Sequence, residues 1–304
     1  MVQRPRVNDP TVLVIGNLDG VHRGHQAVLQ QGRSLAHERE LSLSVLTFDP
    51  HPNQVLRGWT PARLATLERR VELLKRHVAD QVLIEPFTTE LAAFPPERFA
   101  TELLGQRLHA RAVVVGENFR FGSHRAGDLD ALRDFGHTLG FDVVASGVAG
   151  DDHGAYSSTR VRDAVGRGDL DEACRLLGRR HSLSGVVEGG DRRGRTIGFP
   201  TANVGNVAEV LPPHGVYAVF ADDRPAVMNL GVRPTVDGKS LRVEVHLFDF
   251  DGDLYGASMR VHLVRLLREE RRFTGLDELK AQIARDAEAA RTALAGLAPG
   301  DGFQ

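Results

Sequence analysis

Apolar and polar positions follow two different rhythms along this chain. Up to about residue 178, short runs rich in β-branched residues alternate with longer segments in which apolar residues recur at helical spacing. The strand-like runs cover residues 11–15, 43–48, 82–84, 112–115 and 142–145, and the helical segments cover 24–38, 63–77, 97–108 and 129–139. This alternation predicts a parallel sheet with helices on both faces, which binds ligands at the carboxyl ends of its strands.

The rhythm changes near residue 181. A short helix pair comes first, at 159–166 and 170–177, and Gly178 ends it. Period-two runs separated by Gly, Pro and Asp then follow at 184–188, 216–220, 226–230, 241–248 and 258–266. They predict a small antiparallel barrel, which an amphipathic helix at 276–294 closes, with Thr274 or Asp277 near its cap. We therefore expect an α/β protein with a parallel-sheet domain (1–180) and a β-barrel domain with a C-terminal helix (181–304).

The composition narrows the class of protein. A chain of 304 residues has room for two domains, and 41% apolar with 26% charged residues is typical of globular proteins. The formal net charge of -2 gives no basic excess for binding nucleic acid. The apolar runs are too short to cross a bilayer, and the N-terminus lacks the apolar core of a secretory signal. We expect a cytoplasmic protein with no nucleic-acid or membrane partner and leave its oligomeric state open.

The sole cysteine, Cys174, excludes an internal disulfide framework and a Cys-rich metal cage. It lies in a stretch with helical periodicity. We therefore expect a packed thiol rather than a nucleophile.

The first candidate site follows the first strand, in Gly16-Asn-Leu-Asp-Gly-Val-His-Arg-Gly-His25. A helix N-terminus offers free N–H groups to phosphate, and the imidazoles of His22 and His25 add donors to a developing phosphate charge. Three glycines, at 16, 20 and 24, permit close backbone approach. Alternatively, the histidines only cap a turn. A zinc pair is less favoured because no third ligand is evident at helical spacing.

A second polar segment, Ser157-Ser-Thr-Arg-Val-Arg162, opens a helix after the last strand of this half. Hydroxyls, N-terminal amides and guanidinium groups together make an anion site suited to a triphosphate. Taken alone, such a run is more often a simple helix cap. Its combination with His-x-Gly-His on the first strand–helix turn is much rarer, and resembles the nucleotidylyltransferase superfamily.

The second half contains a segment dense in glycine and arginine, residues 185–203. Composition alone favours a surface hairpin at 189–198. It is followed by Phe199-Pro-Thr-Ala-Asn203, in which a rigid turn precedes a hydroxyl and an amide, oxygen ligands suited to a phosphate-bound Mg²⁺. Glycine-rich backbone beside such ligands can cradle phosphates.

The motifs of the first half occur in the order found in bacterial bifunctional riboflavin kinase/FMN adenylyltransferases. They are Gly16–Gln26, Thr47-Phe-Asp-Pro-His-Pro52, Val115-Gly-Glu-Asn-Phe-Arg-Phe-Gly122, Arg125-Ala-Gly-Asp128 and Ser157–Arg162. The second half is similar to riboflavin kinases in Gly185–Asn203, Gly215-Val-Tyr217, Asn229-Leu-Gly-Val-Arg-Pro-Thr235, Glu244–Gly256 and Arg268 with Phe273. The resemblance covers roughly residues 11–286. It implies a nucleotidylyltransferase (Rossmann-like) domain followed by a riboflavin kinase barrel.

For FMN adenylylation the resemblance implies two groups of residues. The ATP-binding group comprises Gly16, Asn17, Asp19, His22, His25, Ser158, Thr159 and Arg162, with the two histidines stabilising charge in the transition state. The FMN-binding group comprises Asp49, His51 and Asn118. No base is needed because the FMN phosphate is already ionised, so positioning and electrostatics suffice, with Mg²⁺ on the leaving pyrophosphate.

For the kinase reaction the resemblance implies ATP binding by Gly190, Gly194, Arg195, Thr201 and Asn203, of which the last two also hold the metal. Glu244 is the implied base for the ribityl hydroxyl. A lone Glu in a strand would ordinarily face outward as a surface residue. The surrounding motif, and not the spacing, is what suggests a catalytic role for Glu244. Arg268 and Phe273 would cover the flavin. The implied substrates are riboflavin, FMN and ATP.

Two positions depart from the family pattern: Leu18 stands where Phe is usual, and Tyr156 where Ile is usual. Both look like packing positions, so they put substrate affinity in question and not the reaction class. One alternative function is a different adenylyltransferase, which would not need the motifs of the second half. Another is a flavin-binding regulatory protein without turnover, against which the intact polar residues of both sites argue.

Overall fold

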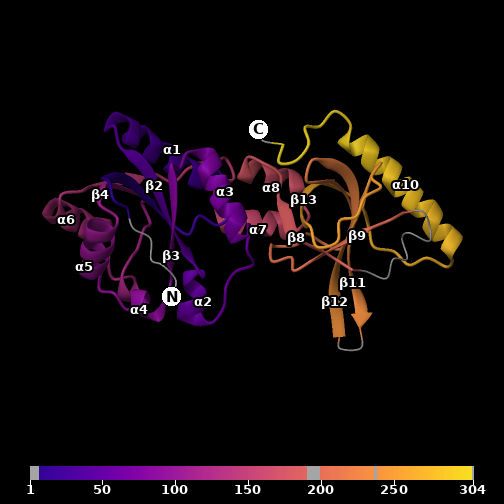
Figure 1. Cartoon of the computed structure of the whole chain (residues 1–304), viewed down its shortest axis with the longest axis horizontal. Helices are drawn as coiled ribbons and strands as arrows, with labels where there is room; N and C mark the ends of the chain where they lie inside the picture. The colour runs from indigo at the N-terminus through magenta and orange to yellow at the C-terminus, as the bar shows by residue number, and fades with distance from the viewer. Residues whose placement is uncertain (1–6, 190–198, 236–237, 303–304) are drawn as a thin grey trace. The chain divides into compact units, whose positions relative to one another are not determined.

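The computed structural model describes residues 7–189, 199–235 and 238–302 (Figure 1). Its internal contacts separate two compact units, Met1–Pro61 with Leu67–Ser157, and Ala62–Thr66 with Ser158–Gln304. This division places the helix pair that precedes the barrel in the second unit. A functional boundary at residue 180 stays a prediction.

The first unit is built on a five-stranded parallel sheet in the order β3-β2-β1-β4-β5. Its strands are β1 (Thr11–Ile15), β2 (Ser42–Asp49), β3 (Gln81–Pro86), β4 (Ala110–Gly116) and β5 (Asp142–Ser146). All four pairings are parallel, which confirms the sheet expected from the alternating pattern. Because β1 lies between β2 and β4, the loops that leave these three strands meet at one edge of the sheet.

Helices connect the strands. They are α1 (Arg23–Glu38), α2 (Pro52–Arg57), α3 (Leu67–His77), α4 (Thr89–Ala92), α5 (Pro96–Arg98), the π-helical η1 (Phe99–Arg107), the 3₁₀ turn η2 (Ser123–Arg125) and α6 (Leu129–Leu139). A short hairpin, β6 (Gly150–Asp151) and β7 (Gly154–Ala155), follows β5. The expected helix at 63–77 begins only at α3 because residues 62–66 belong to the second unit, where the backbone N–H of Val210 donates to Arg63 O.

Alternate residues of the strands enter two separate cores. Leu13 and Ile15 pack with η1 and α6 on one face, whereas Val12 and Val14 pack with α1 and α3 on the other. Burial on both faces explains why the strands are continuously apolar. The polar residues expected in the first site follow these strands at their carboxyl ends.

The second unit begins with α7 (Ser158–Gly166) and α8 (Leu170–Leu177) and continues as a closed barrel. The strands are β8 (Ser182–Glu188), β9 (Ala202–Gly205), β10 (Gly215–Ala221), β11 (Arg224–Thr235), β12 (Gly238–Leu247) and β13 (Ser258–Glu269), in the order β10-β11-β12-β9-β8-β13. The antiparallel barrel is confirmed, but β9 was not expected from the sequence.

Among the described residues, no helix is long and apolar enough to cross a membrane.

The C-terminal helix α10 (Leu276–Leu294) lies along the outside of the barrel (Figure 1). Tyr217 and Val219 of β10 point into the barrel core, whereas Val216 and Ala218 point outward and pack in the cluster that holds Ala290 of α10. The barrel therefore has a second apolar contact outside its own core. Through this contact, α10 covers part of the outer surface of the barrel.

Candidate active sites

The loop between β1 and α1 carries the histidine motif. His22 is buried and caps α1: the backbone N–H of His25 donates to His22 Nδ1 at 3.4 Å. The two imidazole rings are stacked, with centroids 3.6 Å apart and planes inclined by 23°. The capping role considered from the sequence is therefore real. It also presents two stacked imidazoles at the N-terminus of a sixteen-residue helix, which favours an anion.

The remaining expected ligands of this loop surround the same helix start. Gly16 follows β1 directly, and its N–H donates to Leu46 O at 3.1 Å. Asn17 is anchored by its carbonyl, which accepts from Thr47 Oγ1 at 3.0 Å and from Arg70 Nη1 at 2.9 Å. Asp19 is buried. The loop thus has a defined backbone path over the edge of the sheet.

Two of the expected FMN-binding residues lie at the end of the neighbouring strand. Asp49 ends β2, and His51 caps α2 by accepting the N–H of Asn53 at Nδ1. His51 Nε2 lies 3.5 Å from Asn17 Nδ2. The structure therefore brings the motif after β1 and the motif after β2 together.

Asn118, the third expected FMN-binding residue, follows β4 and is exposed. It lines an open hollow of about 460 Å³. Arg120 and Asp128 form an ion pair at 3.1 Å in the wall of this hollow. The side chain of Asp128 also caps α6 through the N–H of Ala131.

The serine–threonine motif opens α7 in the second unit. Ser158 is half-buried and Thr159 is exposed. Arg162 Nε donates to Ala62 O at 2.7 Å, and Ala62 belongs to the same unit. The first-unit histidines and these three residues are thus described in separate units.

The structure describes both positions that depart from the family pattern. Leu18 is buried in the apolar core beside α1, with a left-handed backbone (φ 50°). Tyr156 is half-buried, and its carbonyl lies 2.9 Å from where a Cβ on Gly24 would be. Gly24 is therefore required by the close passage of the Tyr156 backbone.

A cavity of about 340 Å³ lies on the outside of the barrel. Outward-facing side chains of β10, β11 and β12 form one wall, and the segment after β13 together with α10 forms the other. The lining residues are Phe199, Thr201, Val216, Val227, Asn229, Arg242, Glu244, His246, Arg268, Glu270, Arg271, Phe273, Leu279, Ile283 and Asp286. Four of the five described residues expected in the kinase site are among them. Asn203 is the exception, and Gly190, Gly194 and Arg195 lie outside the described residues.

Glu244, which lines this cavity, lies at the centre of a row of polar residues on three neighbouring strands. In the barrel register it pairs with Asn203 of β9 on one side and with Asn229 of β11 on the other. Residues directly opposite each other project from the same face of a sheet, so both amides flank the carboxylate. Arg242, two residues earlier on β12, donates from Nη1 to Glu244 Oε1 at 2.6 Å. Glu244 does face outward from the barrel core, but it faces the covered cavity.

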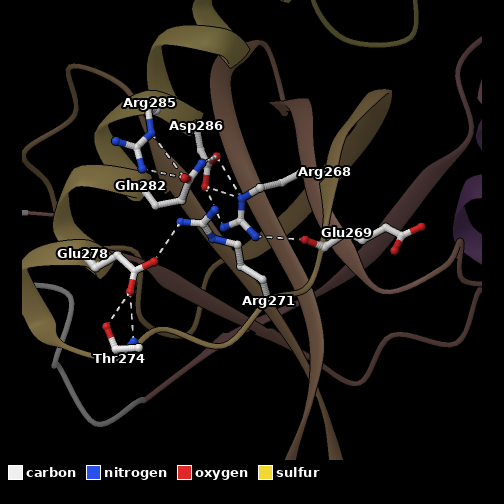
Figure 2. Close-up of polar contacts among 8 residues, drawn as sticks. All are labelled: Arg268, Glu269, Arg271, Thr274, Glu278, Gln282, Arg285 and Asp286. Atoms are coloured by element: carbon white, nitrogen blue, oxygen red, sulfur yellow. Dashed lines mark hydrogen bonds and ion pairs between the residues drawn. The ribbon is translucent and has the colours of Figure 1, made fainter.

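Arg268 is held at the cavity by α10 (Figure 2). Its Nε and Nη2 donate to the Asp286 carboxylate at 2.8–3.0 Å, and Gln282 Nε2 donates to the same carboxylate at 2.7 Å. The Asp286 side chain is only 8% exposed. The Arg268 guanidinium carbon lies 5.7 Å from the centroid of the Phe273 ring. The two expected flavin-binding residues are therefore adjacent.

A second arginine ties the segment around Phe273 to the same helix. Arg271 lies 4.7 Å from the ring centroid and forms an ion pair with Glu278 at 3.3 Å. The N–H and hydroxyl of Thr274 both donate to Glu278 and hold the pKa of that carboxyl below its ordinary value. Figure 2 shows both attachments of the segment to α10. Two arginines thus lie near one aromatic ring.

Several cavity residues were not expected from the sequence: Asn229, Arg242, His246 and Asp286. Asn229 and His246 lie within recognised motifs. The side of the sheet from which their side chains project follows only from the strand register. Period-two alternation around Glu244 could have identified Arg242 and His246 as sharing its face. Asp286 had no local signal, because its role depends on α10 packing beside β13.

Comparison with known proteins assigns both halves. The family model for FAD synthetase matches residues 4–160, and the family model for riboflavin kinase matches residues 177–294. A bifunctional riboflavin kinase/FMN adenylyltransferase of Escherichia coli (strain K12) is 43% identical over 286 residues, covering 92% of this chain and 91% of that protein. One from Bacillus subtilis (strain 168) is 36% identical over 292 residues, with 92% and 91% covered.

A solved structure shares the fold over nearly the whole length. It is titled a macrolide-efflux protein from Streptococcus pneumoniae, with 30% identity, a TM-score of 0.84 and coverage of 94% of this chain and 95% of that chain. A Rossmann-like sheet unit joined to a flavokinase-type barrel defines a two-domain transferase of flavin-cofactor synthesis. The chain belongs to the family of bifunctional riboflavin kinase/FMN adenylyltransferases.

Proposed function

We propose that this chain catalyses two successive reactions at separate sites. In the barrel cavity, riboflavin and ATP give FMN and ADP. At the sheet edge of the first unit, FMN and a second ATP give FAD and pyrophosphate. The substrates are small molecules, and the protein works in the cytoplasm. The observation that carries the proposal is the position of Glu244 between two amides in a cavity closed by Arg268 and Phe273.

In the kinase reaction, the Glu244 carboxylate accepts the proton of the ribityl 5′-hydroxyl as that oxygen attacks the γ-phosphorus of ATP. The O–P bond to ADP breaks as the new O–P bond forms. Arg268 and Phe273 cover the flavin ring on the side opposite β12, which excludes water from the attacking position. Gly190, Gly194 and Arg195 would bind the ATP phosphates.

Mg²⁺ fits the donor set of the kinase cavity. Thr201 offers a hydroxyl and Asn203 an amide oxygen, both hard ligands. Asn203 lies on the strand paired with Glu244, and Thr201 lies just before that strand. When bound, the ion would neutralise charge on the phosphates of ATP. Among the described residues, no group of three or more His, Cys, Asp and Glu could hold a metal ion. We propose that the ion arrives bound to ATP and that Thr201 and Asn203 would be its protein ligands.

In the adenylyl transfer, an FMN phosphate oxygen attacks the α-phosphorus of ATP and pyrophosphate leaves. The FMN phosphate is already ionised, so His22 and His25 serve as hydrogen-bond donors to the phosphates and not as bases. Gly16, Asn17 and Asp19 shape the loop around them. The proposed role of Ser158, Thr159 and Arg162 is to bind the triphosphate, and that of Asp49, His51 and Asn118 is to hold FMN.

The experiment is a chromatographic product assay with purified protein, Mg-ATP and either riboflavin or FMN. Glu244→Gln should stop FMN formation from riboflavin while FAD still forms from supplied FMN. His25→Ala should do the reverse. Loss of both reactions in either folded variant would refute separate sites, and no product from the unaltered protein would favour a flavin-binding protein without turnover.

A further inference from the structure

His246 joins the cavity wall to the turn that precedes β9. It lies on β12 two residues after Glu244, so both side chains face the same side of the sheet. Its Nδ1 lies 2.7 Å from the carbonyl oxygen of Pro200. The imidazole also packs edge-on against Phe199 and Phe248, with ring centroids 5.5 and 5.8 Å away.

This contact lies where backbone pairing between β12 and β9 stops. The register pairs Glu244 with Asn203 and Val245 with Ala202, and β9 begins at Ala202. Thr201 therefore lies just before the strand. The Pro200 carbonyl and the Thr201 N–H belong to the same peptide group. A hydrogen bond to that carbonyl therefore fixes the orientation of the peptide plane that precedes Thr201.

Thr201 is thus held from both sides. The strand ladder holds the residue after it, and the imidazole holds the peptide before it. An exposed threonine outside a strand would otherwise sample several backbone conformations. Ordering it when ATP binds would then cost conformational entropy. A side-chain hydrogen bond that removes this freedom in advance improves the binding of whatever the hydroxyl contacts.

We propose that His246 is a positioning residue of the kinase reaction, which fixes the Pro200–Thr201 peptide and thereby aims the Thr201 hydroxyl at Mg-ATP. The proposal rests on the proposed role of Thr201. Since a carbonyl oxygen only accepts, His246 must carry a proton on Nδ1. The neutral ring is therefore the Nδ1–H tautomer, and Nε2 is left facing away from this contact.

Three substitutions separate the hydrogen bond from the packing. In His246→Asn the amide nitrogen occupies the position of Nδ1, in His246→Gln that of Nε2, and His246→Phe keeps the aromatic contacts without any donor. The Phe and Gln variants should raise the KM for Mg-ATP in FMN formation about five- to tenfold, the effect of one lost hydrogen bond. The Asn variant should recover most of it, and the KM for riboflavin should change less than twofold, roughly the scatter of such comparisons.

A double-mutant cycle with Thr201→Ala tests whether His246 acts through Thr201. If it does, His246→Phe has little further effect once the hydroxyl is gone. Additive effects would overturn the proposal, as would an Asn variant as poor as Phe. If Thr201→Ala itself leaves the KM for Mg-ATP unchanged, the assignment of Thr201 fails, whatever His246 does. FAD formation from FMN, measured in every variant, should stay unchanged.

An imidazole ¹⁵N spectrum of the free protein supplies a readout that does not depend on activity. The His246 resonances are assigned by their loss in His246→Asn. Their shifts should report a protonated Nδ1 at neutral pH. A ring protonated only at Nε2 would overturn the proposal, because it could not donate to Pro200.

Discussion

Glu244 of β12 and Asn203 of β9 are direct cross-strand partners in the barrel. The pair places the proposed base and a proposed metal ligand on one rung of the sheet. A hydroxyl that loses its proton to Glu244 would therefore lie beside the phosphate-bound Mg²⁺ that Asn203 helps to hold.

Removing the amide of Asn203 should weaken metal use in the kinase reaction alone. Asn203→Ala should raise the Mg²⁺ concentration for half-maximal FMN formation about tenfold, because one ligand to a charged ion is lost. The measurement is a Mg²⁺ titration at fixed ATP, with FAD formation from FMN as the internal control. Asn206→Gly, which removes a side-chain hydrogen bond to Glu188 and keeps the left-handed backbone of this residue (φ 59°), is the control. An unchanged requirement in Asn203→Ala would rule out the ligand role.

Gly24 should be essential to adenylyl transfer for steric reasons. A Cβ there would lie 2.9 Å from Tyr156 O and 3.1 Å from the His22 ring. Gly24→Ala must therefore displace the imidazole or the passing backbone, and FAD formation should fall roughly ten- to a hundredfold.

The control for this substitution is Gly147→Ala, where an added Cβ meets nothing within 4 Å. FMN formation should be unchanged in both variants. Wild-type FAD formation in Gly24→Ala would show that the position of His22 does not matter to the reaction.

Asp286 should stabilise the fold and the flavin site together. Asp286→Ala leaves Arg268 and Gln282 without their shared acceptor, so the free energy of unfolding should fall by roughly 2–4 kcal/mol. The KM for riboflavin should rise because Arg268 is released. Urea unfolding and steady-state kinetics measure the two effects.

Replacing both partners separates the charge from the packing. An Arg268→Met/Asp286→Met double variant should lose less stability than Asp286→Ala, because no charged group is then left half-buried. Equal losses would mean that the unpaired charge of Arg268 is not what destabilises Asp286→Ala.

His181 should make stability depend on pH. Its side chain is buried with Nε2 2.9 Å from Val210 O, and burial lowers its pKa to about 4. In the unfolded chain the group titrates near its ordinary value of 6.5. Between these values the unfolded state binds more protons, so stability is full above pH 6.5 and is lost as the pH falls toward 4, by roughly 3 kcal/mol in all.

Urea unfolding at several pH values tests this, with His181→Gln as the comparison. Burial raises the pKa of nearby Glu209, so its contribution acts in the opposite direction, with stability lost as the pH rises. Both proteins should therefore also be measured with Glu209→Gln. If the slope below pH 6.5 is the same with and without His181, another group causes it.

Local pattern was sufficient for most elements of the fold. The parallel strands were predictable because both of their faces are buried, and α6, α8 and α10 begin and end where helical periodicity does. The strand β9 was missed because it has four residues and follows a Pro-containing turn, so alternation is too short to detect. The start of α3 was placed too early because residues 62–66 belong to the second unit, where Arg63 forms an isolated β-bridge with Glu209.

The sequence by itself determined the order of elements, both sites as motifs, and the side of the strand from which Glu244 projects. These follow from the spacing of residues along the sequence, which does not depend on tertiary contacts. Only the tertiary structure decided that this side is a cavity, since α10 must pack across the barrel to cover it. It also decided which groups meet there: Asn203, Asn229 and Asp286 reach Glu244 and Arg268 through strand register and helix packing, which depend on contacts between residues far apart in the chain.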